Sequence, residues 1–212
     1  MLLGVVFLAI LATVPLARGR LSALGDLQIR MPGLAVAGIL AQVLIVSIVP
    51  QGLGWAADVI HLGSYALLGA CAWLNRRIPG VPFIALGGLL NVIAIAANGG
   101  VMPADPSLIV HASQAGGHGF VNSGVVAHPH LAFLGDQFAT PRSWPMANVY
   151  SVGDFTILFG VFWLLHRVSG SRVLSWLGPV RLGPPAPRTA ADRAAAVAAR
   201  AAARSTRREA LA

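Results

Sequence analysis

The run VPFIALGGLLNVIAIAA occupies residues 81–97 and holds no charged side chain. Four further runs are mostly apolar, namely residues 1–17, 34–49, 55–74 and 152–168. A helix needs roughly 20 mostly apolar residues to cross a bilayer, with a range of about 17–25. Backbone polar groups in lipid must be bonded within the segment, so each run is expected to be a helix. The pattern therefore predicts an all-α membrane protein with five transmembrane helices.

The composition of the 212-residue chain favours the same class. Charged residues make up 10% of the chain, against about 25% in an average soluble domain, so water-soluble classes are set aside. All 15 basic residues are arginine, and the absence of lysine excludes a lysine Schiff base. The single cysteine, Cys71, excludes an intrachain disulfide and a paired-cysteine metal site.

The arginines predict how the helices are oriented. Five alternating helices would place fourteen of the 15 arginines on one side and only Arg142 on the other. Because arginine is enriched on the cytoplasmic side, the N-terminus is predicted outside and the C-terminus in the cytoplasm. Residues 1–17 lack a positively charged start, which favours a retained first helix over a cleaved signal peptide. The predicted location is a bacterial cytoplasmic membrane, crossed several times. The bacterial source is inferred from a composition rich in alanine and arginine.

Two other segments complete the predicted domain organisation. Four helices fall within residues 1–97 and the fifth within 149–168. Between them, residues 98–148 form a long stretch with apolar pieces and several histidines. Because long loops are usually functional or disordered, we expect a small extracytoplasmic cap, with a flexible loop as the alternative. Residues 169–212 are rich in arginine and alanine, and we expect a disordered cytoplasmic tail or a surface helix that binds anionic lipid head groups. No nucleic-acid partner is predicted.

Polar residues near the predicted outer ends of the helices are candidates for a ligand or proton pocket. In the run 55–74, offsets of three and four place Asp58, His61 and Tyr65 on one helix face. An ionisable residue inside a membrane helix indicates function by default. The alternative is structural, with Asp58 capping its helix and His61 bonded to a neighbouring helix. Together with residues at the end of the fourth helix and the start of the fifth, the candidates are Asp58, His61, Asn98, Ser151 and Asp154.

A metal site is the weaker candidate. His128 and His130 could supply two ligands, and Asp136 or Asp105 could supply a third. The His-x-His spacing is common in single sequences, however, and no recognised metalloenzyme motif accompanies it. No nucleophile–base, phosphate-loop or paired-carboxylate signature appears either. No catalytic residue and no cofactor are therefore predicted. Enzyme activity stays open, with the balance against it.

Several motifs follow one another in a fixed order along residues 1–168. They are Arg18-Gly19-Arg20 with Leu24 and Asp26, Trp73-Leu74-Asn75-Arg76-Arg77, Asn98-Gly99-Gly100-Val101-Met102-Pro103, Phe133-Leu134-Gly135-Asp136 and Asn148-Val149-Tyr150-Ser151-Val152-Gly153-Asp154. This ordered set resembles a family of bacterial integral membrane proteins known only by a domain of unknown function. The resemblance implies no activity. It implies that a set of structural residues belongs to the family's pattern, among them Gly99, Gly100, Met102, Pro103, Gly135 and Gly153.

Three functions stay open at this point. The first is a non-catalytic integral membrane protein that serves as an accessory or scaffold subunit of a larger membrane complex, because apolar helices with few buried charges suit lateral packing. The second is ion or small-molecule handling, as a transport component or sensor, through the outer polar pocket. The third is a membrane enzyme at the outer face, using His61 or the cap histidines. The sequence favours the first, with the lipid bilayer and membrane-protein subunits as partners.

Overall fold

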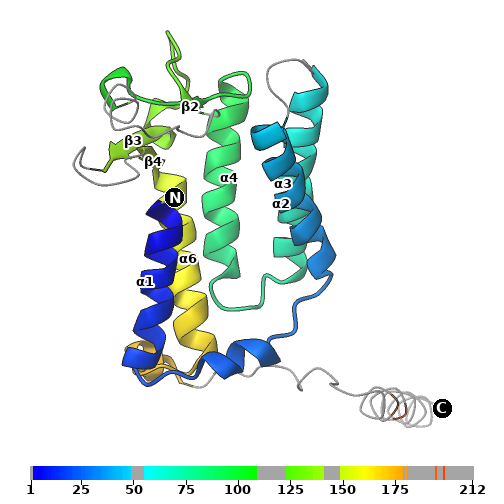
Figure 1. Ribbon diagram of the computed structural model, residues 1–212, viewed down its shortest axis with the longest axis vertical. Helices are drawn as coiled ribbons and strands as arrows, with labels where there is room; N and C mark the ends of the chain where they lie inside the picture. Colours follow the sequence, from blue (N-terminus) through cyan, green and yellow to red (C-terminus); the bar gives the residue numbers. More distant parts are fainter. Residues whose placement is uncertain are drawn as a thin grey trace, which may run out of the picture.

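The computed structural model describes residues 2–48, 55–108, 123–140 and 149–178, and singly residues 180, 194 and 198. Of residues 2–3, 45–48 and 55–58 it describes the backbone alone. The long helices are α1 (Leu2–Leu16), α2 (Pro32–Ile48), α3 (Trp55–Leu74), α4 (Val81–Ala97) and α6 (Val152–Val168). They run alternately up and down (Figure 1). Their bounds fall within two residues of the five apolar runs.

The lengths of these helices overturn the predicted membrane topology. In the described ranges, no helix combines the length and the apolar character that crossing a bilayer requires. Helices α1, α2, α4 and α6 have 15, 17, 17 and 17 residues, at or below the lower end of the range of about 17–25 for a membrane helix. Helix α3 has 20 residues but carries Asp58, His61 and Tyr65.

The prediction of an all-α protein with five transmembrane helices was therefore wrong. The predicted multi-pass location in a bacterial cytoplasmic membrane, with the N-terminus outside and the C-terminus in the cytoplasm, is wrong for the same reason. Apolar content favours helix formation and burial, but it does not by itself fix how far a helix extends.

The helices pack in two groups. Helix α2 packs along α3, α4 packs along α6, and α1 lies beside α6 (Figure 1). Helices α4 and α6 approach closely because glycines face each other there. A Cβ on Gly87 would meet the Ile157 backbone nitrogen at 2.8 Å, so only a hydrogen fits. The contact between α3 and α4 is much smaller, and a cleft lies between the two groups.

Short strands lie over the upper ends of α4 and α6 (Figure 1). Strand β1 (Met102–Pro103) pairs in parallel with β2 (Ser123–Gly124), and β3 (Asp136–Ala139) pairs antiparallel with β4 (Val149–Ser151). A short 3-10 helix, η2 (Ala132–Leu134), precedes β3. These small sheets also depart from the predicted all-α class. The described parts of the segment 98–148 are thus folded against the helices, while residues 109–122 and 141–148 lie outside the description.

A buried histidine joins α1 to α6 at the opposite end of the molecule. His166 is 1% exposed, with its Nε2 3.0 Å from the Thr13 hydroxyl and its Nδ1 2.6 Å from the Ser171 hydroxyl. Two 3-10 helices flank this contact, η1 (Leu21–Asp26) and η3 (Arg172–Leu177). Burial lowers the pKa of His166 because the interior disfavours the charged imidazolium. His166 therefore acts here as a neutral hydrogen-bonding link between helices.

Candidate functional site

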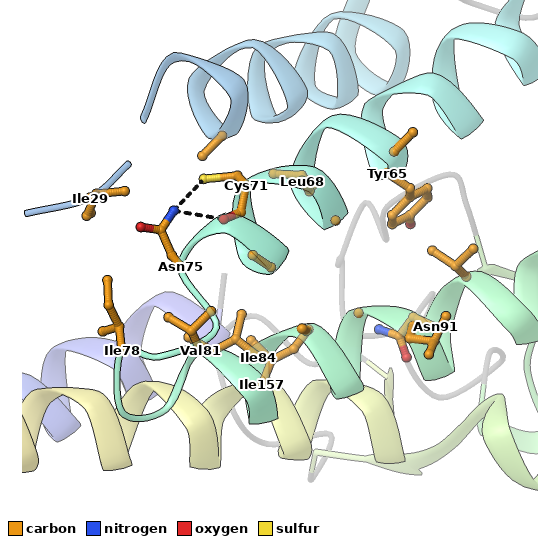
Figure 2. Close-up of a pocket in the computed structure, with 18 of the residues that line it drawn as sticks. Ile29, Tyr65, Leu68, Cys71, Asn75, Ile78, Val81, Ile84, Asn91 and Ile157 are labelled. Carbon is orange, nitrogen blue, oxygen red and sulfur yellow. Dashed lines mark hydrogen bonds between the residues drawn. The ribbon is translucent and has the colours of Figure 1, made fainter. Parts of the chain in front are cut away.

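A cleft of about 700 Å³ separates the α2–α3 pair from the α4–α6 pair. Its wall is mostly aliphatic, as Figure 2 shows for Leu68 on α3, Val81 and Ile84 on α4, and Ile157 on α6. Small-molecule sites in proteins have volumes of about 300–1,000 Å³ and combine an apolar wall with a few polar groups. The cleft therefore has the size and chemistry of a small-molecule site.

The lower end of the cleft holds a polar side chain whose hydrogen bonds are made within the protein. The Asn75 amide nitrogen donates to the carbonyl oxygens of Arg30 at 2.9 Å and Cys71 at 2.8 Å. Its side-chain oxygen accepts from the Arg30 backbone nitrogen at 2.8 Å. Because Asn75 is 6% exposed and so engaged, it ties the chain before α2 to the end of α3. A ligand at this end would meet mainly the surrounding apolar side chains, such as Ile29 and Ile78 (Figure 2).

The middle of the cleft carries polar side chains from three helices. Gln42 on α2, Tyr65 on α3 and Asn91 on α4 all line it. Each is nine or ten residues from the lower end of its helix, which places all three roughly 15 Å above that end at 1.5 Å per residue. Within the described residues, the side chains of Gln42 and Tyr65 have no hydrogen-bond partner. These two groups are therefore available to a bound molecule.

The Tyr65 hydroxyl stays protonated well beyond neutral pH. Burial raises its pKa above the ordinary value of 10.0, and the nearby charge of Asp154 raises the pKa further. In Figure 2 the hydroxyl points across the cleft toward α4. Tyr65 therefore presents a hydrogen-bond donor to the space in the cleft.

Asn91 connects the cleft to the start of α6. Its amide nitrogen donates to Asp154 Oδ1 at 2.9 Å, and its side-chain oxygen accepts from the Ser151 hydroxyl at 2.8 Å. Ser151 ends β4 in an extended conformation and caps α6. The Asp154 backbone nitrogen donates to the Ser151 hydroxyl, and Asp154 Oδ2 accepts from the Ser151 backbone nitrogen, both at 3.0 Å. The structure thus brings together two predicted pocket residues, Ser151 and Asp154.

The other predicted pocket residues are arranged differently. The His61 ring lies 5.1 Å from the Tyr65 ring, one turn nearer the strands. Asn98 holds the strand region to the end of α4, because its side chain exchanges two hydrogen bonds with the His130 backbone, at 2.8 and 2.9 Å. Asp58 lies on α3, and its side chain is outside the description. In the structure, His61 therefore lies beside Tyr65 on α3, and Asn98 binds the His130 backbone.

The residues predicted as metal ligands differ in exposure. His128 and His130 are exposed, whereas Asp136 is 4% exposed and accepts a hydrogen bond from the Ser123 hydroxyl at 2.5 Å. Burial raises the pKa of Asp136 to about 6, although the Ser123 hydrogen bond opposes the rise, and the charge of Asp154 adds to it. Among the residues described, no three His, Cys, Asp or Glu side chains are grouped so that they could hold a metal ion. The other two histidines of the segment 98–148, His111 and His118, lie outside the description.

The predicted structural motif occupies turns and close contacts. Gly99 and Gly100 end α4 with φ of 67° and 94°, a region that favours glycine. Met102 and Pro103 are buried in β1, and a Cβ on Gly135 would collide with the Pro103 carbonyl oxygen. Gly153 packs against α4 so closely that a Cβ would collide with it. These positions therefore have local structural reasons for their residue types.

Four polar residues of the cleft wall are not among the predicted pocket residues, namely Gln42, Tyr65, Asn75 and Asn91. Tyr65 was only placed on one helix face with Asp58 and His61. A signal for Gln42 was present, because it and Ser47 are the two polar side chains in the run 34–49. Asn91 stands out similarly as the polar residue inside the run 81–97. Asn75 gave no such signal, since it lies in a turn rich in polar residues.

Comparison with known proteins identifies relatives but no activity. A family model described as a family of unknown function (DUF5317) matches residues 26–166. An uncharacterised protein of Thermotoga maritima is 30% identical over 113 residues, which cover 53% of this chain and 65% of that relative. The match thus spans slightly less than two thirds of the relative's length. No solved structure matches the chain.

Proposed function

The chain belongs to the DUF5317 family, whose function is unknown, so we propose a function from the geometry of the chain itself. We propose that it is a non-catalytic protein that binds an apolar small molecule in the cleft between its helix pairs. The sequence left open ion or small-molecule handling through a polar pocket at the outer helix ends. The function proposed here differs, because it assigns binding to the apolar cleft. The observation that carries the proposal is a cleft of about 700 Å³ with an almost wholly apolar wall.

Burial of apolar surface supplies the driving force for binding. Each buried CH₂ group contributes about 0.8 kcal/mol. The side chains that would surround the molecule come from four helices and two turns, so the site is formed by packing of the whole helical part. A site formed in this way is largely in place before the ligand arrives, which limits the ordering that binding requires.

Two glycines on α3 allow a direct test. Gly69 lines the cleft, and a Cβ there meets nothing within 4 Å, so the ring in a Gly69→Phe variant would project into the cleft. Gly63 has equally open surroundings but is not part of the cleft wall. Gly63→Phe is therefore a matched control, with the same change on the same helix. Gly88→Phe provides a second blocking variant, from the α4 wall.

The probe is N-phenyl-1-naphthylamine, an uncharged dye that brightens in apolar surroundings. We expect saturable binding to the wild-type protein, at least tenfold weaker binding in Gly69→Phe and Gly88→Phe, and unchanged binding in Gly63→Phe. Far-UV circular dichroism of each variant establishes that the helices are retained. Equal binding in the blocked and control variants would show that the dye binds elsewhere and would refute the proposal.

A second candidate function is the accessory or scaffold subunit, and a different observation favours it. On α2, the apolar side chains of Val36, Ile39 and Leu40 are 56%, 53% and 55% exposed. Contiguous exposed apolar surface of this kind marks contacts with other proteins. A stoichiometric subunit that co-purifies with the wild-type protein and is lost in Leu40→Arg, but kept in Leu8→Arg on α1, would support this role. A protein that purifies without any such subunit would argue against it.

A further inference from the structure

The two ends of the cleft differ in what they can offer a ligand. At the lower end, both side-chain groups of Asn75 are engaged by backbone atoms of the protein. Roughly 15 Å away, at 1.5 Å per residue along α3, Tyr65 has no hydrogen-bond partner within the described part of the chain. Gln42, on the neighbouring helix α2, likewise has no hydrogen-bond partner among the described residues. A ligand therefore finds its polar contacts at one end of the cleft and apolar contacts toward the other.

The open polar groups also indicate what the ligand's polar end must contain. A protonated tyrosine hydroxyl is a donor, and the Gln42 amide carries both a donor and an acceptor. An oxygen in a hydroxyl, a carbonyl or a carboxylate can accept from Tyr65 and from the Gln42 amide nitrogen, and a hydroxyl can also donate to the Gln42 amide oxygen. A buried polar group is most stable when such partners are present, because an unpaired one costs about 1–3 kcal/mol.

The charge behind this site argues against an anionic ligand. Asn91 lies on the cleft wall, and its amide nitrogen is 2.9 Å from Asp154 Oδ1. The charge of Asp154 reaches Tyr65, where it raises the pKa of the hydroxyl after the larger effect of burial. A carboxylate head group would meet the same charge in partly apolar surroundings, where like charges repel more strongly than in water.

We propose that the cleft binds an amphipathic molecule whose uncharged hydroxyl or carbonyl head lies between Gln42 and Tyr65, with its apolar tail extending toward Asn75. This inference rests on the proposed function, because it concerns the same cleft. It adds the chemical class of the ligand and its direction in the site.

Competition against the same dye tests the head-group chemistry separately from binding itself. The competitors are decan-1-ol, methyl decanoate and decanoate, which share a ten-carbon chain and differ in the head. We expect decan-1-ol and methyl decanoate to displace the dye from the wild-type protein at concentrations at least tenfold lower than decanoate. Decanoate that competes as well as decan-1-ol would overturn the assignment of an uncharged head.

Two substitutions test the position of the head. Tyr65→Phe removes the donor, and we expect the affinity for decan-1-ol to fall roughly tenfold while dye binding is kept. Tyr150→Phe is the matched control, because Tyr150 lies in β4, outside the cleft wall, and should leave both affinities unchanged. Asp154→Asn keeps the shape of the side chain but removes its charge, and it should narrow the difference between decan-1-ol and decanoate.

The outcomes separate the two proposals. The proposed function would be refuted if the dye did not bind, or if its affinity were unchanged in Gly69→Phe. Dye binding at the cleft, with decan-1-ol affinity unchanged in Tyr65→Phe, would leave the function standing and overturn the placement of the head.

Discussion

Replacing Gly153 with alanine should destabilise the protein by about 2–4 kcal/mol, although alanine is the better helix former. Gly153 lies in the first turn of α6, against α4. A Cβ at this position would collide with the side-chain oxygen of Asn91 and would come within 2.6 Å of the Gly87 carbonyl oxygen. One of these obstacles is backbone, so a change of side-chain rotamer cannot make room.

The magnitude follows from three contributions. Overpacking at a tight contact costs about 1–3 kcal/mol. Displacing the Asn91 side chain weakens its hydrogen bonds to Ser151 and Asp154, which contribute about 1 kcal/mol each. The higher helix propensity of alanine offsets roughly 1 kcal/mol of this loss.

The assay is urea unfolding followed by far-UV circular dichroism, with the free energy extrapolated to water. The control is Gly63→Ala, the same change in α3, where a Cβ meets nothing within 4 Å. This control should stabilise the protein by about 0.5–1 kcal/mol, because only the propensity difference acts there. If Gly153→Ala and Gly63→Ala changed the free energy of unfolding equally, the close α4–α6 contact at Gly153 would be refuted.

Three further predictions concern buried polar groups. The pKa of Asp136 is about 6 in the folded protein, against an ordinary value of 3.8. Between these two pH values the folded state binds more protons than the unfolded state. The free energy of unfolding should therefore fall as the pH rises from about 4 to 6. In Asp136→Asn that part of the slope should disappear from unfolding curves recorded across the window; an unchanged slope would contradict the raised pKa. The pKa of His166 is lowered from its ordinary 6.5, so its contribution to stability should be complete above pH 6.5 and decline as the pH falls below it. In His166→Gln the free energy of unfolding should fall less steeply below pH 6.5. An equally steep fall would mean that other groups cause it. Thr13→Val removes the hydroxyl near His166 Nε2 and should cost about 1–2 kcal/mol by urea unfolding, whereas no loss would mean that this contact contributes nothing.

The helix bounds were predictable because local signals set them. Each helix coincides with an apolar run, and the breaks fall at residues such as Pro79 and Gly80, before α4, and Gly99 and Gly100, after it. The error in the predicted fold lay elsewhere. Apolar runs were taken as membrane spans, yet the same composition also suits helices that end after 15 or 17 residues and pack on one another.

Some contacts of the candidate site were also predictable from local sequence, and others were not. Ser151 and Asp154 are three residues apart and form a capping box, which sequence spacing indicates directly. Their link to Asn91 joins residues 60 and 63 positions apart, and no local pattern reveals it. The contact that Asn98 makes is also long-range. Asn98 was assigned to the pocket from its place at a helix end, but it binds the backbone of His130, 32 residues away.

The sequence by itself determined where the helices lie, how they end and how α6 is capped, because these features depend on contacts within about four residues. Only the tertiary structure decided that α4 and α6 meet through glycines, while α3 and α4 leave a cleft of about 700 Å³. It also decided that Gln42 and Tyr65 open into this cleft while Asn75 is engaged by the protein. The reason is physical: which faces of separate helices touch depends on packing among distant side chains, and packing of that kind leaves no periodic trace in the chain.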